Sequence, residues 1–112
     1  MNNENEMEIK NMTPNEIVVF LEEGNVKIPS EGVVRVAETR KLLKEVEGIK
    51  IYSKTFGTSD ELPPKKEGQY IIVSVPVAQA HPERKDLIIP DDLVRDGGKI
   101  VGCKSFSILN VN

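Results

Sequence analysis

The segment between residues 81 and 86 holds the densest group of side chains that could do chemistry. It contains His81, Arg84 and Asp86, and His81 is the only histidine of the chain. Arginine recognises phosphate or carboxylate with two parallel hydrogen bonds, aspartate can orient it, and histidine changes charge near neutral pH. We therefore expect a ligand- or partner-binding site here. The competing interpretation is a surface loop with an exposed Arg84–Asp86 ion pair of little energetic value.

Three further residues complete the candidate binding set. Ser74 and Gln79 belong to a stretch where a strand is expected to run into a helical turn, whose backbone amides could meet an anion. Arg95 could join Arg84 over a shared cavity. However, Arg95 and Asp96 precede two glycines, and we favour a simple hairpin turn there.

A catalytic alternative uses His81 with Asp86 or Asp91 as general acid and base. No glycine-rich nucleotide-binding motif accompanies these residues, so a binding module is favoured over a small hydrolase or nucleotide-modifying enzyme. The single cysteine, Cys103, cannot form an internal disulfide, and we expect it to be a small buried residue. No ligand pair has the spacing of a metal site, so we predict neither a metal nor another cofactor.

Composition limits the classes of partner. The chain has 112 residues, which is the size of one domain, and a net charge of −3. A negative net charge disfavours a nucleic-acid partner, whose phosphates are neutralised by clustered Lys and Arg. No apolar run approaches the roughly 20 residues that span a bilayer, so no membrane segment is expected. With its single cysteine, the chain suits the reducing cytoplasm.

Short apolar runs between turn residues predict a mainly β fold. Structure is expected to begin at 7–13, with Met7, Ile9 and Met12 facing inward. The further expected strands are 16–22, 26–29, 33–38, 70–75, one around Leu87–Ile89, and a last hairpin that turns at 96–98. The segment 57–69 has almost no apolar content and predicts a long exposed loop.

Two stretches need separate treatment. The stretch 41–51 predicts a hairpin that turns at Glu47 and Gly48, and a short helix over 41–46 remains the alternative. Pro76 interrupts the strand pattern but is tolerated at a helix start, so 77–80 is expected to form one helical turn. Gly102, inside the last strand, predicts a bulge or a close backbone approach.

These signals together predict a small single-domain barrel or sandwich, mainly β or β-rich α+β. We expect about seven to nine short strands and one short helix. Residues 1–6 are polar, so they are expected to form a flexible tail ahead of a single domain over 7–112.

Several segments also follow a recognisable order along the chain: IKNMTPNEIVV, VKIPSEGVVRVAE, VSVPVAQA, ERKDLIIP and VRDGGKIVGCKSFS. As a set they resemble short uncharacterised proteins of bacteriophages and of prophage-bearing bacterial genomes. The resemblance covers most of the chain after Glu6. It implies an origin in a mobile element, and hence the cytoplasm of the host cell as the location, but neither an activity nor site residues.

The sequence therefore predicts a non-enzymatic binding module of a virus or mobile element. Its partner is expected to be a host protein or a small anionic ligand that it sequesters. The small enzyme described above is one alternative. A virion or assembly protein is the other, because an exposed edge strand would suit a homo-oligomer.

Overall fold

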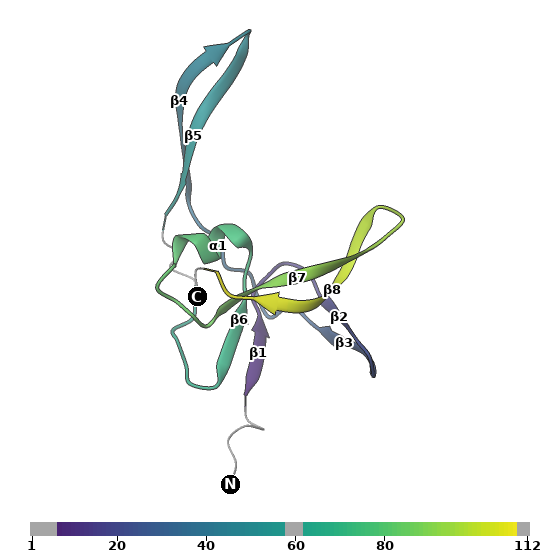
Figure 1. Cartoon of the computed structure of the whole chain (residues 1–112). Coiled ribbons are helices and arrows are strands. Elements are labelled where there is room, and N and C mark those ends of the chain that lie inside the picture. Colours follow the sequence, from purple (N-terminus) through teal and green to yellow (C-terminus); the bar gives the residue numbers. More distant parts are fainter. Residues whose placement is uncertain (1–6, 58–61, 110–112) are drawn as a thin grey trace.

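The computed structural model describes residues 7–57 and 62–109, which form a mainly β fold with one short helix (Figure 1). The predicted fold class is confirmed, whereas the tail expected over 1–6 lies outside the described residues. The elements are β1 (Glu8–Asn11), β2 (Ile17–Leu21), β3 (Gly24–Ile28), β4 (Glu38–Val46), β5 (Ile49–Phe56), β6 (Gln69–Ile72), α1 (Val75–Ala80), β7 (Leu87–Asp96) and β8 (Lys99–Ser107).

Six strands form one sheet in the order β1-β6-β7-β8-β2-β3, which curls into a half barrel. β1, β6 and β7 are parallel neighbours, and α1 provides the crossover from β6 to β7 that a parallel pair requires. β7 and β8 form an antiparallel hairpin, and β2 and β3 form another. β8 joins β2 in parallel through the pair Val19 and Cys103.

Asn11 joins the two ends of this strand order. It is the last residue of β1, and its side-chain amide donates to the carbonyl of Ile28, the last residue of β3, at 3.0 Å, and to the carbonyl of Asn15 at 2.9 Å. Its Oδ1 accepts from the backbone N–H and the hydroxyl of Thr13 at 3.0 and 2.7 Å. Asn11 is fully buried, and these bonds satisfy its donors and its acceptor, as a buried amide requires. They tie the end of β1 to the end of β3, the two edge strands of the curled sheet.

The core is aliphatic and joins β6, α1 and β7. Ile71 in β6 pairs with Leu87 in β7, and both are buried. The strand expected over 70–75 is confirmed as β6, although it ends at Ile72 because the chain turns into α1. The full buried cluster is Val34, Ile71, Val73, Val77, Ala78 and Leu87.

The strand expected over 33–38 does not form. Residues 29–37 have no regular structure, even though valines favour strands. The backbone N–H of Val34 donates to the Met12 carbonyl at 3.1 Å, and that of Glu31 donates to the Asn11 carbonyl at 2.8 Å. These two separate hydrogen bonds tie the segment to the end of β1 without forming a continuous strand pairing. Val34 is buried, so part of the valine pattern reflects burial in the core.

The prediction that Met7, Ile9 and Met12 face inward was only partly right. Met12 packs against the core cluster. Met7 and Ile9 are exposed instead. A polar residue, Asn11, takes the fully buried position of this strand because its hydrogen bonds compensate for the loss of water.

The stretch 41–51 forms the hairpin that was expected, so the helix alternative is wrong. Glu47 and Gly48 connect β4 to β5 with φ angles of 52° and 78°, as the two central residues of a type I′ turn require. β4 and β5 form a separate two-stranded sheet. Figure 1 shows this hairpin projecting from the rest of the protein. We call residues 38–56 the arm.

Replacing Asn11 by Ala is expected to reduce the free energy of unfolding by about 2–4 kcal/mol. The reason is that the carbonyls of Ile28 and Asn15 and the N–H of Thr13 would lose their partners in a partly buried site. Urea denaturation followed by circular dichroism would measure this. Asn25→Ala, at an exposed position of β3, is the control and should change stability by less than about 0.5 kcal/mol. Equal effects of the two substitutions would contradict the role assigned to Asn11.

Candidate functional site

Arg84 and Asp86 form a buried ion pair just before β7. Nε and Nη2 of Arg84 each donate to one carboxylate oxygen of Asp86 at 2.8 Å. Nη2 also donates to the carbonyl of Pro63 at 2.9 Å. Only 5% of the Asp86 side chain and 16% of the Arg84 side chain are exposed. The interpretation of an exposed pair is therefore wrong, and the pair fastens the loop after residue 62 to the start of β7.

Each partner stabilises the charge of the other. The hydrogen bond with Asp86 raises the pKa of Arg84, and the same bond lowers the pKa of Asp86, in both cases against the effect of burial. Asp86 stays ionised with both oxygens bonded, so it is poorly placed to exchange protons with a substrate. Two nitrogens of Arg84 are already committed inside the protein, which leaves little of its fork for an external anion.

His81 lies at the carboxyl end of α1 and is buried. Its backbone N–H donates to the Ala78 carbonyl at 3.2 Å, and its Nδ1 lies 3.6 Å from a carboxylate oxygen of Glu83. Asp91 is exposed in β7, where the hydroxyl of Ser107 donates to it and lowers its pKa. The acidic neighbour of His81 is thus Glu83, a residue that the sequence analysis did not select.

Ser74 and Gln79 belong to the ends of the short helix. Ser74 occupies the N-cap position of α1, but its side chain makes no capping hydrogen bond. Gln79 is exposed near the other end. Both residues are near His81 in the sequence. Neither side chain forms a hydrogen bond with Arg84 or Asp86.

Arg95 stands far from Arg84. It is exposed near the end of β7, opposite Ile100 of β8. Arg84 precedes the start of that strand, and at roughly 3.3 Å per residue the strand alone separates them by about 26 Å. The two arginines therefore do not share a cavity, and Arg95 belongs to the hairpin that turns at Gly97 and Gly98.

A basic cleft of 310 Å³ lies beside the Arg84–Asp86 pair. Three lysines contribute to its wall, from the loop before β6 and from the segment before β7, together with the ring of Tyr70. The lining also includes two carboxylates, of which Asp86 is already neutralised by Arg84. The residues around it are Met7, Lys65, Lys66, Glu67, Gly68, Gln69, Tyr70, Lys85 and Asp86.

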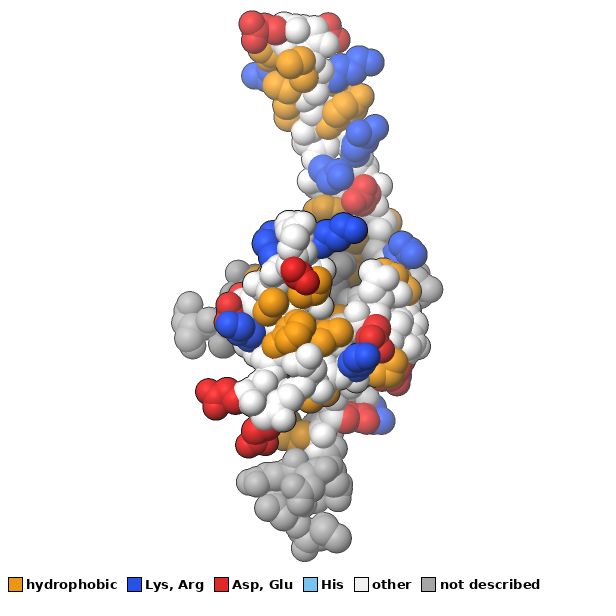
Figure 2. Space-filling model, turned by 90° about the vertical axis from the view of Figure 1, so that its right-hand side faces the viewer, with side chains coloured by type: hydrophobic (Ala, Val, Ile, Leu, Met, Phe, Trp, Pro, Cys, Tyr) orange, Lys and Arg blue, Asp and Glu red, His pale blue; other side chains and the backbone are white. Residues whose placement is uncertain are grey.

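The arm carries a concentration of exposed aliphatic side chains. Val46 pairs with Ile49 next to the turn, and Ile51 lies on the same face because residues two apart share a face. Leu42 pairs with Tyr52 on the opposite face, where a register shift adds Leu43. All six are exposed, and Ile49 is the most exposed at 66%. Figure 2 shows hydrophobic side chains gathered near the end of the arm on the face turned to the viewer.

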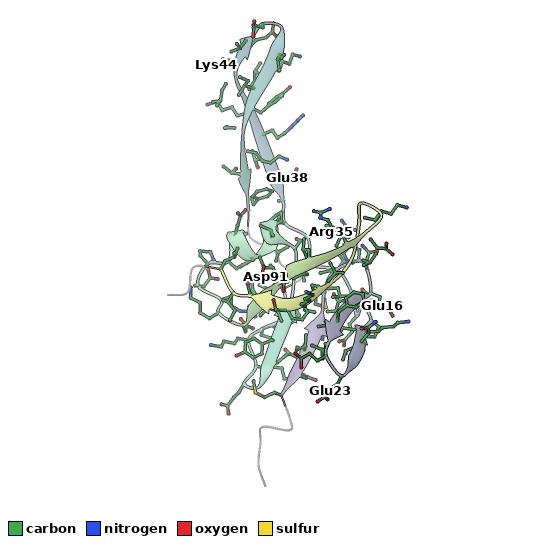
Figure 3. The ribbon with its side chains drawn as sticks, turned by 45° about the vertical axis from the view of Figure 1, so that its right-hand side comes forward. Glu16, Glu23, Arg35, Glu38, Lys44 and Asp91 are labelled. Carbon is green, nitrogen blue, oxygen red and sulfur yellow. The ribbon has the colours of Figure 1, made fainter. Side chains whose placement is uncertain are left out.

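Basic residues accompany this apolar surface. The arm contains five basic and three acidic side chains, so its net charge is positive although that of the whole chain is negative. The Arg40 guanidinium lies 4.3 Å from the centre of the Tyr52 ring, and Lys54 lies 3.5 Å from the Glu38 carboxylate. Figure 3 shows Glu38 near the base of the arm and Lys44 nearer its tip. The arm as a whole is thus basic, whereas its apolar tip carries Glu45 and Glu47 beside Lys44 and Lys50.

An apolar groove of 160 Å³ lies on the body of the protein between β2, β7 and β8. At the bottom of this groove β8 approaches β2 closely, which is possible because Gly102 has no side chain. A Cβ at Gly102 would clash with the carbonyl oxygen of Val18. The close approach predicted for this glycine is therefore confirmed. The lining residues are Glu16, Ile17, Val18, Pro90, Leu93, Ile100, Val101, Gly102 and Cys103.

One charged side chain, that of Glu16, belongs to the lining of the groove. Cys103 is buried as expected, and burial raises the pKa of its thiol, with a smaller contribution from the nearby charge of Asp91. Figure 3 shows Glu16 and Asp91 on the body, away from the arm.

A scan against protein-family models found no match for this chain, and neither did searches of curated proteins and of solved structures. Among residues 7–57 and 62–109, no group of three His, Cys, Asp or Glu side chains is placed to hold a metal ion. In the same residues, no helix is long and apolar enough to cross a membrane.

Replacing Arg84 by Leu is expected to destabilise the protein by about 3–5 kcal/mol, because it leaves the Asp86 carboxylate buried without its partner. The double variant Arg84→Leu with Asp86→Leu should lose less than the single variant, since no buried charge remains unpaired. Chemical denaturation would measure both. A double variant that is the less stable of the two would contradict this account.

Stability should also depend on pH through Asp86. Because its pKa is lowered in the folded chain, its contribution is present above the unfolded value of about 3.9 and is lost as pH falls toward the folded value. Denaturation curves below about pH 5 should therefore show a steeper loss of stability for the wild type than for Asp86→Asn. Parallel losses in the two proteins would argue against a lowered pKa.

Proposed function

We propose that this chain is a non-enzymatic binding module that holds another protein through the arm. The observation that carries the proposal is the apolar surface on both faces of a projecting hairpin. A two-stranded hairpin alone is marginally stable in water, and among the described elements the arm meets the body mainly where β5 lies near α1. A partner that covers the arm would bury the side chains that the chain itself leaves exposed.

The exposure of individual side chains supports the same conclusion. Six apolar side chains of the arm are between 39% and 66% exposed. Exposed apolar patches of this kind mark interaction sites in soluble proteins.

The composition of the arm favours a protein over a nucleic acid. Phosphate binding depends on clustered cations, but the acidic side chains Glu38, Glu45 and Glu47 offset part of the positive charge of the arm. The exposed aliphatic side chains together with Tyr52 and Arg40 instead fit a protein interface, in which aromatic residues and arginine are enriched. As part of this proposal, the chain originates from a phage or prophage and acts in the host cytoplasm, in line with the resemblance of its sequence.

The basic cleft supports a second candidate, the sequestration of a small anionic ligand. Its volume of 310 Å³ falls at the lower end of the range for small-molecule sites. Lys65, Lys66 and Lys85 could neutralise an anion while Tyr70 covers an apolar part. Native and denaturing mass spectrometry side by side would decide: a mass excess lost on denaturation supports this candidate, and an unchanged mass speaks against retention of a ligand.

Ile49→Asp is expected to abolish partner binding by the arm, because it places a charge at the most exposed apolar position. Immobilised wild type should retain a partner from extracts of the cells that make this protein, and the variant should retain roughly tenfold less or worse, as at an interface hot spot. Quantitative mass spectrometry of the bound fractions measures the difference. Val75→Asp is the matched control, since Val75 is an exposed valine on α1. If wild type and Ile49→Asp retain the same proteins, the proposal is wrong.

A further inference from the structure

The arm and the apolar groove are complementary surfaces of the same molecule. The tip of the arm is aliphatic and carries Lys44 on the face of Ile49, whereas Glu45 and Lys50 lie on the other face and Glu47 lies in the turn. The groove is aliphatic and is lined by Glu16, with Asp91 close to its Cys103. In Figure 1 the arm extends away from β2, β7 and β8, so its tip does not reach the groove of its own chain. Any contact between these two surfaces must therefore join two molecules.

The groove has room for one large side chain. Its volume of 160 Å³ is close to the roughly 150 Å³ of an apolar cavity that holds a benzene-sized molecule. Ile49 at the arm tip is a suitable occupant because it is the most exposed aliphatic side chain of the described residues. An aliphatic side chain that fills a desolvated pocket, surrounded by weaker polar contacts, is the usual arrangement at the centre of a protein interface.

We propose that the partner held by the arm is a second copy of this chain, with Ile49 of one copy seated in the apolar groove of the next. This inference rests on the proposed function, because it assigns the partner of the arm. The arm and the groove are different surfaces, so two copies can exchange arms reciprocally in a closed dimer. If the rotation does not close, the same contact adds copies in a ring or a filament.

Two charged residues, one on the arm and one in the groove, would orient the two copies in this contact. Lys44 lies in the register position opposite Ile51, on the same face of the arm as Ile49. Glu16 lies in the lining of the groove. Their attraction would steer the arm tip toward the groove, and salt would weaken it.

The first experiment measures the mass of the purified full-length protein by sedimentation equilibrium over a wide range of concentration. The wild type and Val75→Asp are expected to associate. Ile49→Asp should weaken association by roughly thirtyfold, as loss of an interface hot spot does, with an unchanged circular dichroism spectrum. A wild type that stays monomeric at every concentration overturns the inference, and so does an oligomer that Ile49→Asp leaves intact.

The second experiment tests whether the arm meets this groove. Lys44→Glu and Glu16→Lys are each expected to weaken association by about tenfold, because each places like charges together. A mixture of the two variants should associate again, since each arm then finds an oppositely charged groove on the other variant. Failure of the mixture to recover overturns the assigned groove.

The outcomes separate this inference from the proposed function. A monomeric wild type whose arm still retains a different protein from extracts refutes self-association but supports the binding module. A protein whose Ile49→Asp variant changes neither its mass nor the proteins it retains refutes both.

Discussion

The curled sheet depends on one buried asparagine. Strands β1 and β3 stand at opposite ends of the strand order, and only a curved sheet brings them together. Asn11 bonds the end of β1 to the end of β3 and to the turn between β1 and β2. Because the sheet has few aromatic side chains to fill a wide interior, this directional polar contact fixes the relative position of the two edge strands, which aliphatic packing alone would leave poorly defined.

The Arg84–Asp86 pair likewise joins distant segments of the chain, because it ties the loop around Pro63 to the start of β7. Both polar groups lie against the segments that connect strands, and both bond backbone carbonyls of loops as well as side chains. Arg84 and Asp86 are thus occupied in shaping the fold, whereas Ser74, Gln79 and Arg95 are exposed. The surfaces available for recognition include the arm, the apolar groove and the basic cleft.

Much of the fold could be predicted from the sequence, but the surroundings of the candidate site residues could not. Local signals sufficed for the hairpin at Glu47 and Gly48 and for the close approach at Gly102, because the turn and the missing side chain are set by neighbouring atoms. The strand predicted over 33–38 was wrong because alternating valines indicate burial, but they do not indicate whether a neighbouring strand is available for pairing. The burial of Arg84 depends on Pro63, which is distant in sequence. One signal was present and overlooked: the predicted hairpin had apolar residues on both faces, and an isolated hairpin cannot bury both.

The arm also has a consequence for how this protein can change over generations. None of residues 38–56 belongs to the buried core cluster, and the turn at its tip needs only two residues that accept positive φ. Substitutions on its faces can therefore accumulate without loss of the folded body. Under the proposed function, a lineage that carries this gene can alter its binding surface while the folded body stays constant, so that selection on binding acts on other residues than selection on folding.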